Sequence, residues 1–414
     1  MSERELAQKR LLQIQGPGIS FKRPRSEIKS PSEEINLGAL DSLERHSSSS
    51  NPLCTPYGRC SNVSNRYEKI ARIGEGTYGI VYKAYDKKAN KGEPNVVALK
   101  RCLPHHEASD GFPITTLREI EILREIALEK GHDNIVNLRE IAVGSKSSSV
   151  FLVFEFVQFE LAKLIDDHYA KYSKSPFSLA ETKCLSKQLF SALSFLHGKR
   201  IIHRDLKLSN LLYDPSRGLL KLADFGLARR ISSDTCKGSE IGTESEKFSG
   251  KISSLFPSSR GVDNVGNLTP KVVSLWYRAP ELLLNHEKYD IAIDQWSAGC
   301  VLSEFLLGKP LFKGKNDLDQ LRKVIEVLGS RNCRDIKSCN KGSMEAELLE
   351  RDCEGTLFDI FADLSSLGIQ LFQNLLAFDP RKRISAEAAL HCEWIREEPS
   401  ACGKDIMPKF HHKM

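Results

Sequence analysis

Short stretches in which hydrophobic and polar residues alternate are concentrated between residues 67 and 160. Residues 67–72 and 80–86 alternate on either side of a glycine-rich turn, and residues 95–101 and 150–156 add two more apolar stretches. Alternation is typical of β-strands, because successive side chains point to opposite faces of a sheet. The pattern predicts a small antiparallel sheet and one amphipathic helix at residues 115–129.

From about residue 161 onward the hydrophobic spacing becomes mostly helical, most clearly at residues 178–197 and 289–307. We therefore expect an α+β fold in two lobes, with a β-rich lobe at residues 67–154, a connection at 155–160 and a helical lobe at 161–396. Residues 231–263 are rich in Ser, Gly, Thr and Lys and are expected to form an exposed, mobile insertion. Residues 397–414 would form a C-terminal tail.

The first 66 residues have a different composition. They hold a short helical pattern at residues 5–15, a basic cluster from Phe21 to Arg25 and a stretch rich in Ser and Pro. Such a segment buries too little apolar surface to offset its ordering entropy, so we expect it to be mostly disordered. The basic cluster fits a nuclear import signal and a chance cluster equally well.

Composition says more about the cellular compartment of the protein than about the chemistry it carries out. The 414 residues are 40% hydrophobic, and the net charge of +6 indicates a mildly basic surface. The 11 cysteines contain no C-x-x-C pair, which argues against a zinc site and favours free thiols in a reducing compartment. There is no apolar signal region at the start and no apolar run long enough to span a bilayer. We therefore expect the nucleus and/or the cytoplasm, and no membrane partner. No basic platform interleaved with aromatic residues appears, so direct nucleic acid binding is not expected.

The glycine-rich turn fits the pattern G-x-G-x-x-G-x-V. It comprises Ile73, Gly74, Glu75, Gly76, Thr77, Tyr78, Gly79 and Val81. A dinucleotide-binding fingerprint would open a helix, whereas these glycines join two predicted strands. A strand–turn–strand unit of this kind can fold over nucleotide phosphates, because small residues let backbone N–H groups approach them.

Lys100 lies at the end of the apolar sequence Val-Ala-Leu-Lys on the third predicted strand. An exposed surface lysine is the alternative, but the apolar flanks mean that this ammonium group needs a partner. Glu119 on the predicted helix is the natural candidate. A Lys–Glu pair of this kind can hold the lysine against the α- and β-phosphates of a nucleotide.

Residues 203–210, His-Arg-Asp-Leu-Lys-Leu-Ser-Asn, bring a carboxylate, an amine and an amide close together. Asp205 can accept and orient the proton of an attacking hydroxyl, and Lys207 can neutralise a transferring phosphoryl group. Asn210 can reach a metal ion. The carboxylate of Asp224, which begins the sequence Asp-Phe-Gly, can bind Mg²⁺ between phosphate oxygens.

Two further interactions are expected to hold this region together. Glu281 closes the sequence Ala-Pro-Glu and can pair with Arg383. Asp294 can tie down the backbone of the loop that carries Asp205.

These motifs occur in the order and approximate spacing of protein kinases, so residues 67–396 resemble that family. A lysine two residues after Asp205 is the pattern of serine/threonine kinases. Residues 113–119 (Pro-Ile-Thr-Thr-Leu-Arg-Glu) and 269–281 resemble the cyclin-contacting helix and the end of the activation segment of cyclin-dependent kinases. Short matches at residues 57–60 and 407–412 resemble the tenth cyclin-dependent kinase, whose partner is cyclin M. The PITSLRE kinases, partnered by L-type cyclins, are close behind.

The resemblance implies a bilobal kinase fold with ATP and Mg²⁺ as cofactors. It implies Asp205, Lys207, Asn210 and Asp224 as catalytic residues, with Asn210 and Asp224 as the metal ligands. Besides the glycine-rich turn, Lys100 and Glu119, it implies a nucleotide site lined by Val81, Ala98, Phe154, Glu155, Val157, Glu160 and Leu212.

The resemblance also implies regulation by a cyclin, which would bind the helix beginning at Pro113 and complete the Lys100–Glu119 pair. Thr269 would be phosphorylated, and its phosphate would be bound by Arg118, Arg204 and Arg229. Thr77 and Tyr78 match inhibitory phosphorylation sites. Val272 and Val273 match a pocket for proline, which implies protein substrates with Ser/Thr-Pro sites.

The chain departs from the family in two places. The segment from Asp224 to Glu281 is unusually long, and residues 330–363 lack the family's Pro/Trp-containing stretch. The main rival is a cyclin-binding pseudokinase scaffold, which would typically have lost Lys100, Asp205 or Asp224. A kinase activated without a cyclin would carry T-x-Y before Ala-Pro-Glu, whereas Thr269 stands without that tyrosine.

Overall fold

The computed structural model of the chain describes residues 60–76, 79–89, 95–102, 114–144, 149–231, 272–286, 288–333, 344–350 and 352–410. The expected helix at residues 5–15, the basic cluster at residues 21–25 and residues 232–263 of the expected insertion lie outside these residues. Within the described ranges, no helix is both long and apolar enough to cross a membrane.

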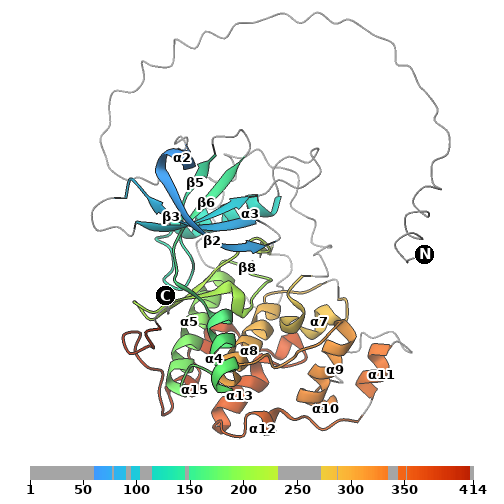
Figure 1. Ribbon diagram of the computed structural model, residues 1–414. Coiled ribbons are helices and arrows are strands. Elements are labelled where there is room, and N and C mark those ends of the chain that lie inside the picture. Colours follow the sequence, from blue (N-terminus) through green and yellow to red (C-terminus); the bar gives the residue numbers. More distant parts are fainter. Residues whose placement is uncertain are drawn as a thin grey trace, which may run out of the picture. The chain divides into compact units, whose positions relative to one another are not determined.

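The β-rich part is a six-stranded sheet with one long helix beside it, α3 (Ile114–Leu128) (Figure 1). In spatial order the strands are β1 (Ser61–Asn62), β5 (Leu138–Val143), β6 (Val150–Glu155), β4 (Val96–Cys102), β3 (Gly79–Asp86) and β2 (Tyr67–Gly76). Every neighbouring pair is antiparallel except β1 and β5. The strands and the helix expected from the hydrophobic pattern are confirmed, with their ends shifted by a few residues.

Residues 61–66 also belong to this lobe, which corrects the expected boundary at residue 67. After β1 comes α2 (Val63–Arg66), and Val63 is buried in a small core of the sheet. The Arg66 guanidinium donates to Asp86 (Nη2–Oδ2 2.9 Å) and to Glu140 (Nη1–Oε2 2.8 Å). The Tyr67 hydroxyl also donates to Glu140, at 2.6 Å. Because Asp86 and Glu140 lie on β3 and β5, this segment is held by strands that are remote in sequence.

The remainder of the described chain is mainly helical, as expected from residue 161 onward. Its longer helices are α4 (Leu161–Tyr172), α5 (Leu179–Gly198), α8 (Ala292–Leu307), α9 (Asp317–Leu328) and α13 (Ser366–Leu375). Shorter ones are α7 (Pro280–Leu283), α10 (Ser330–Cys333), α11 (Met344–Glu350), α12 (Leu357–Ile360), α14 (Ala386–Leu390) and α15 (Glu393–Arg396). The sequence pattern for α5 and α8 is confirmed, and α5 begins with a capping box in which Ser178 and Glu181 satisfy each other's backbone N–H groups.

Short strands connect the sheet to the helices. A three-stranded sheet pairs β10 (Leu219–Leu222), β9 (Leu211–Asp214) and β7 (Phe159–Glu160), and a second pair joins β8 (Ile201–Ile202) to β11 (Arg229–Arg230). Single 3₁₀ turns lie at η2 (Leu208–Asn210), η4 (Leu275–Tyr277) and η5 (Pro380–Lys382). Most of the motifs of the sequence lie on or next to these short elements, so the connection between the lobes carries the candidate site.

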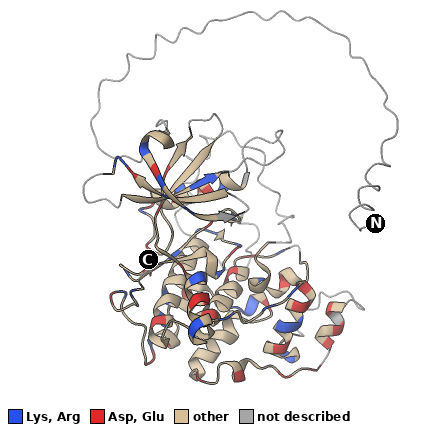
Figure 2. Ribbon diagram, in the orientation of Figure 1, with Lys and Arg blue, Asp and Glu red and all other residues tan. Residues whose placement is uncertain are grey.

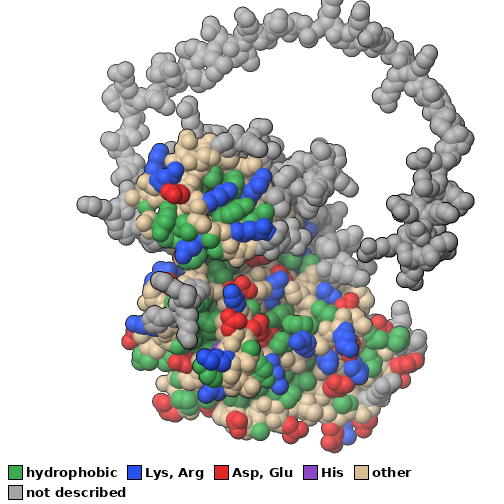
Figure 3. Space-filling view, in the orientation of Figure 1, with side chains coloured by type: hydrophobic (Ala, Val, Ile, Leu, Met, Phe, Trp, Pro, Cys, Tyr) green, Lys and Arg blue, Asp and Glu red, His purple; other side chains and the backbone are tan. Residues whose placement is uncertain are grey.

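Charge is distributed differently over the two lobes. Acidic and basic residues are mixed along α9 and over the helical lobe (Figure 2). In the view of Figure 3, basic side chains gather beside hydrophobic ones on the β-rich lobe.

Candidate active site

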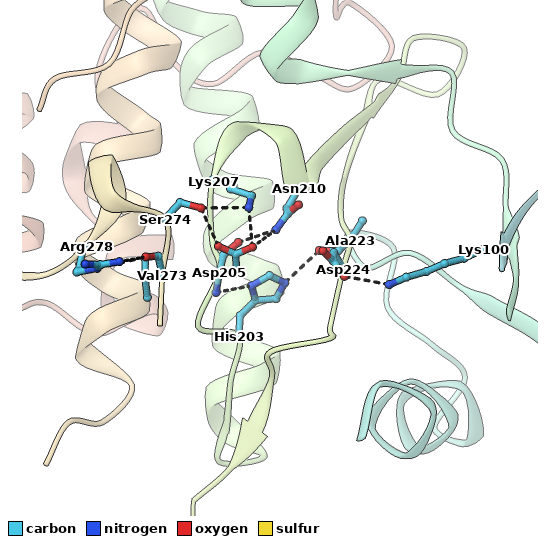
Figure 4. A network of polar contacts seen from close by, with 10 residues as sticks. All are labelled: Lys100, His203, Asp205, Lys207, Asn210, Ala223, Asp224, Val273, Ser274 and Arg278. Carbon is cyan, nitrogen blue, oxygen red and sulfur yellow. Dashed lines mark hydrogen bonds and ion pairs between the residues drawn. The ribbon is translucent and has the colours of Figure 1, made fainter. Parts of the chain in front are cut away.

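Lys100 bridges two carboxylates that come from opposite sides of the site. Its Nζ donates to both oxygens of Glu119 on α3, at 2.8 and 2.9 Å, and to Oδ1 of Asp224 at 3.0 Å (Figure 4 shows the latter contact). The expected Lys100–Glu119 ion pair is therefore present. Burial alone would lower the pKa of Lys100, but the charges of Glu119 and Asp224 outweigh it and raise that pKa above its usual value.

The register of the sheet explains why Lys100 lies at this point. On β4, Lys100 pairs with Val81 of β3 on one side and with Leu152 of β6 on the other. Two residues earlier, Ala98 pairs with Phe154. Residues of a strand that are two apart share a face. The expected nucleotide contacts Val81, Ala98 and Phe154 are thus gathered around Lys100 by strand pairing alone.

The glycine-rich turn joins two strands of the same sheet. Ile73, Gly74, Glu75 and Gly76 are the last residues of β2, and Gly79 opens β3; Thr77 and Tyr78 lie outside the described residues. A Cβ atom on Gly79 would lie 2.2 Å from the carbonyl oxygen of Arg101. Only glycine fits there, because β3 and β4 pair closely at that position.

The segment between the lobes supplies the other expected nucleotide contacts. Val157 is buried, and Glu160 on β7 pairs with Leu212 on β9. The Glu155 side chain is engaged elsewhere, since it accepts from Nζ of Lys221 at 2.6 Å and from the backbone N–H of Asn137 at 2.9 Å. Glu155 can therefore contribute its backbone, but not its carboxylate, to a nucleotide.

Asp205 is the centre of a compact polar network (Figure 4). One of its oxygens, Oδ2, accepts from Nζ of Lys207 at 2.7 Å and from the side-chain amide of Asn210 at 3.1 Å. The other, Oδ1, accepts from the Ser274 hydroxyl at 3.1 Å, and Lys207 also donates to that hydroxyl at 3.1 Å. Three expected catalytic side chains are thus brought together, with Ser274 joining them to the far end of the activation segment.

Asp294 holds the backbone of the same loop, as expected. Its carboxylate, 1% exposed, accepts from the backbone N–H groups of His203 (2.8 Å) and Arg204 (3.0 Å). Nε2 of His197 lies 3.1 Å from the same carboxylate. Burial by itself would raise the pKa of Asp294, but the hydrogen bonds and charge of these partners hold it below its usual value.

The loop that carries Asp224 packs against the loop that carries Asp205. His203 lies 3.1 Å, through Nε2, from the carbonyl oxygen of Ala223, and its ring meets the buried Phe225 ring edge-on at 5.0 Å. The backbone N–H of Ala223 donates to the Asn210 carbonyl at 2.8 Å. Burial opposes ionisation of Asp224, but Lys100 outweighs it and lowers the pKa of this carboxyl.

Asn210 and Asp224 offer a suitable pair of oxygens for a divalent metal ion. The Asn210 amide nitrogen donates to Asp205, so the amide oxygen of Asn210 points away from Asp205. Asp224 uses Oδ1 to accept from Lys100. Mg²⁺ prefers hard oxygen ligands, and usually takes one or two from a protein with the rest from water and phosphate. No group of three or more His, Cys, Asp or Glu side chains able to hold a metal occurs in the described part of the chain.

The three arginines expected around Thr269 all lie in the described part, whereas Thr269 itself does not. Arg118 is on α3 and Arg229 is on β11. Arg204 donates to the Leu227 carbonyl (2.7 Å) and to the Tyr289 hydroxyl (2.9 Å). Burial lowers the pKa of Arg204, and the nearby positive charge of Arg229 adds to that effect.

The end of the activation segment is fixed at two places. Arg383 forms a bidentate ion pair with Glu281, with both N–O distances 2.7 Å and side-chain exposures of 0% and 2%. Val273 has a left-handed backbone (φ 71°), and its carbonyl accepts two hydrogen bonds from Arg278, at 2.9 and 3.2 Å. The first of these interactions was expected from the sequence, and the second was not.

Ser274, Arg278 and Tyr289 are the residues that sequence reasoning missed. Each acts through a partner that is remote in the chain or through the backbone. The sequence offered one signal for Ser274, which is a polar residue directly after two valines. It offered no signal for Tyr289.

Comparison with known proteins agrees with this geometry. Residues 67–395 match the family described as Protein kinase domain. The chain is 38% identical over 380 residues to Cyclin-dependent kinase G-2 of Oryza sativa subsp. indica, covering 88% of this chain and 47% of the relative. It is 38% identical over 356 residues to Cyclin-dependent kinase 10 of Rattus norvegicus, covering 86% of this chain and 87% of the relative.

A third relative is Serine/threonine-protein kinase PITSLRE of Drosophila melanogaster, 38% identical over 356 residues that make up 84% of this chain and 33% of the relative. The chain thus spans about half the length of the rice relative, most of the rat relative and a third of the fly relative. The extent of these matches shows that the chain belongs to the protein kinase family, among the cyclin-dependent serine/threonine kinases.

Proposed function

We propose that the protein transfers the γ-phosphoryl group of ATP to Ser or Thr residues followed by proline, after activation by a cyclin and phosphorylation of Thr269. The observation that carries the proposal is the network around Asp205. A carboxylate that can receive a hydroxyl proton contacts a lysine, an amide and the serine of the segment that would hold the substrate. No expected catalytic side chain is missing, which disfavours a pseudokinase scaffold.

Each residue has a defined task in this mechanism. Lys100, held by Glu119, contacts the α- and β-phosphates, and Asp205 accepts the proton of the attacking hydroxyl and aligns its oxygen. Lys207 stabilises charge on the transferring group from a position 2.7 Å from Asp205. Asn210 and Asp224 would hold Mg²⁺. The ion would supply neutralisation of phosphate charge, which is the main requirement of a loose phosphoryl-transfer transition state.

Specificity for proline is supported by the backbone of Val273. Its carbonyl already accepts two hydrogen bonds from Arg278, so it is a poor acceptor for the N–H of the residue after the target. An N–H buried without an acceptor costs about 1–3 kcal/mol. Proline has no N–H and avoids that cost. Val272 and Val273 are both buried and supply an apolar surface next to this point.

Activation by a cyclin is supported by α3 and by the names of the relatives. Leu117 on α3 is 49% exposed, one turn before the buried residues that anchor the helix, while Glu119 on the same turn faces Lys100. The Lys100–Glu119 pair is already formed in this structure, so a partner that covers Leu117 would hold α3 in the arrangement that keeps the pair together. A cyclin as that partner is supported by the name of the Cyclin-dependent kinase 10 relative. We propose a cyclin of the M or L type, on the resemblance of residues 57–60, 113–119 and 407–412.

Phosphorylation of Thr269 would add about two negative charges, and we propose Arg118, Arg204 and Arg229 as the residues that bind them, as the resemblance implies. Charge-assisted hydrogen bonds to one phosphate would order the activation segment. Phosphorylation of Thr77 or Tyr78 would place the same charge beside the phosphates of ATP and repel them, so these two residues are proposed as inhibitory sites.

A transfer assay with purified protein tests the proposal. Phosphate transfer from ATP to a Ser-Pro peptide is measured with cyclin M, with an L-type cyclin and with neither, and a Ser-Ala peptide tests the proline requirement. Lys100→Met and Asp224→Asn should abolish transfer while circular dichroism stays unchanged. Lys69→Met, on the same sheet and with its ammonium over the Tyr82 ring, is the matched control and should stay active. Cyclin binding without transfer by the wild type would support the scaffold instead.

A further inference from the structure

The C-terminal tail returns to the connection between the two lobes. After α15 the chain runs back along the helical lobe toward the strands that join the lobes (Figure 1). The backbone N–H of Cys402 donates to the Ala180 carbonyl at 3.2 Å, and Met407 is 2% exposed. The Tyr213 hydroxyl donates to the Pro408 carbonyl at 2.9 Å. These contacts place the end of the described tail against β9.

Phe410 lies at the end of this tail within a group of aromatic rings. Its ring meets Phe159 (6.3 Å between centroids), Phe177 (5.9 Å) and Tyr213 (6.0 Å), each in an edge-to-face arrangement. Phe177 in turn meets Tyr213 and Phe305 in the same way. Edge-to-face pairs contribute about 0.5–1.5 kcal/mol each beyond their burial, so three of them define where the rings lie.

The strand pairing connects this group of rings to the nucleotide site. β7 and β9 are antiparallel, with Phe159 opposite Tyr213 and Glu160 opposite Leu212. Directly opposed residues share a face of a sheet and the next pair lies on the other face. Phe159 and Tyr213 therefore form one face, which Phe410 covers. Glu160 and Leu212 form the other face, which is the one assigned to the nucleotide.

We propose that Phe410 is a positioning residue for the nucleotide: by filling the back of the β7–β9 pair, it holds Glu160 and Leu212 where they meet the ribose and adenine of ATP. The inference rests on the proposed function for the identity of the ligand. The geometry behind it, a tail residue packed on the reverse side of two nucleotide contacts, is independent of the chemistry at Asp205.

Phe410→Ala in the full chain is the test. Without the ring, the β7–β9 pair loses its support, and we expect KM for ATP to rise about fivefold, which corresponds to a loss of about 1 kcal/mol in binding. KM for the peptide and kcat should not change, because the hydrogen bonds that hold Asp205, Lys207 and Ser274 in the structure are made with one another and with Asn210, not with the tail. The dissociation constant of a fluorescent ADP analogue, measured without peptide, should rise by the same factor.

Three control variants separate positioning from stability. Phe410→Tyr keeps the ring and should have the wild-type KM for ATP. Ile406→Ala, on the same tail but 69% exposed, should behave as wild type. Phe361→Leu, on a buried ring that directly follows α12 and stacks on Phe372, should lower the melting temperature without changing KM for ATP.

Two results would overturn the proposal: Phe410→Ala lowering only the melting temperature with nucleotide affinity unchanged, or Phe361→Leu raising KM equally. If the wild type transfers no phosphate, the proposed function fails on its own. The ADP-analogue measurement still decides the role of Phe410.

Discussion

Asp294→Asn isolates the contribution of one buried carboxylate to the catalytic loop. The wild-type side chain accepts two backbone N–H bonds, from His203 at 2.8 Å and from Arg204 at 3.0 Å, and Arg204 has a left-handed backbone (φ 66°). Asparagine has the same shape but only one acceptor oxygen. One backbone N–H must then face the new amide NH₂ group, so two donors confront each other in a site that excludes water.

The expected loss follows from those two donors. Each buried donor without a partner costs about 1–3 kcal/mol, so with two such donors the variant should lose about 2–6 kcal/mol of unfolding free energy. Asp205 directly follows Arg204, and a displacement of about 1 Å at a reacting group can cost about 100-fold in rate. We therefore expect kcat to fall about 100-fold. KM for ATP should change little, because Lys100 and the glycine-rich turn do not depend on Asp294.

Thermal unfolding and peptide phosphorylation are measured on the same preparations. The pH dependence gives a second, independent readout. Because the pKa of Asp294 is lower in the folded protein than in the unfolded chain, its contribution is present above the unfolded pKa of about 4 and is lost as pH falls through the folded pKa. The variant should lack that acid-dependent loss. A variant with wild-type kcat and an unchanged melting temperature would refute the assignment of Asp294 as the support of the loop.

Three other changes have expected outcomes. Ser274→Ala removes a hydrogen bond to Asp205 and one from Lys207. A steady-state assay should show kcat reduced about tenfold with folding intact, because a hydrogen bond to a charged group contributes about 1.5 kcal/mol and that energy corresponds to a tenfold change in rate. Glu281→Gln leaves Arg383 buried without a counter-charge and should lower the unfolding free energy in urea by about 3–5 kcal/mol; a loss below 1 kcal/mol would contradict the pairing. Burial raises the pKa of Glu304 to about 8, so the folded protein binds its proton more tightly than the unfolded chain and wild-type stability should decline between pH 4.5 and 8. Glu304→Gln should abolish that decline; an unchanged pH profile would show that Glu304 is ionised in the fold.

Much of the fold could be predicted because local patterns of hydrophobic and polar residues determine its individual strands and helices. The alternation at residues 80–86 and the helical spacing at residues 178–197 correspond to β3 and α5, since each is an element whose own residues define the buried face. The segment at residues 61–66 was assigned wrongly for the opposite reason. Arg66 donates to Ser61 five residues away, but the two carboxylates that pair with it come from β3 and β5.

The sequence by itself determined which chemical groups are available: Lys100, Asp205, Asn210 and Asp224 stand in short motifs whose spacing is set by a turn or a strand end. The pairing of Lys100 with Glu119, and the pairing of Glu281 with Arg383, could be expected because motifs of this order imply them. The tertiary structure alone decided which other residues serve the site. Ser274 donates a hydrogen bond to Asp205, and Arg278 donates to the carbonyl of Val273. Phe410 packs on the face of β7 and β9 that carries Phe159. Ser274 and Phe410 act through contacts between segments far apart in the chain, and Arg278 acts through a backbone carbonyl five residues away. Neither kind of contact leaves a periodicity or spacing in the sequence from which it could be read.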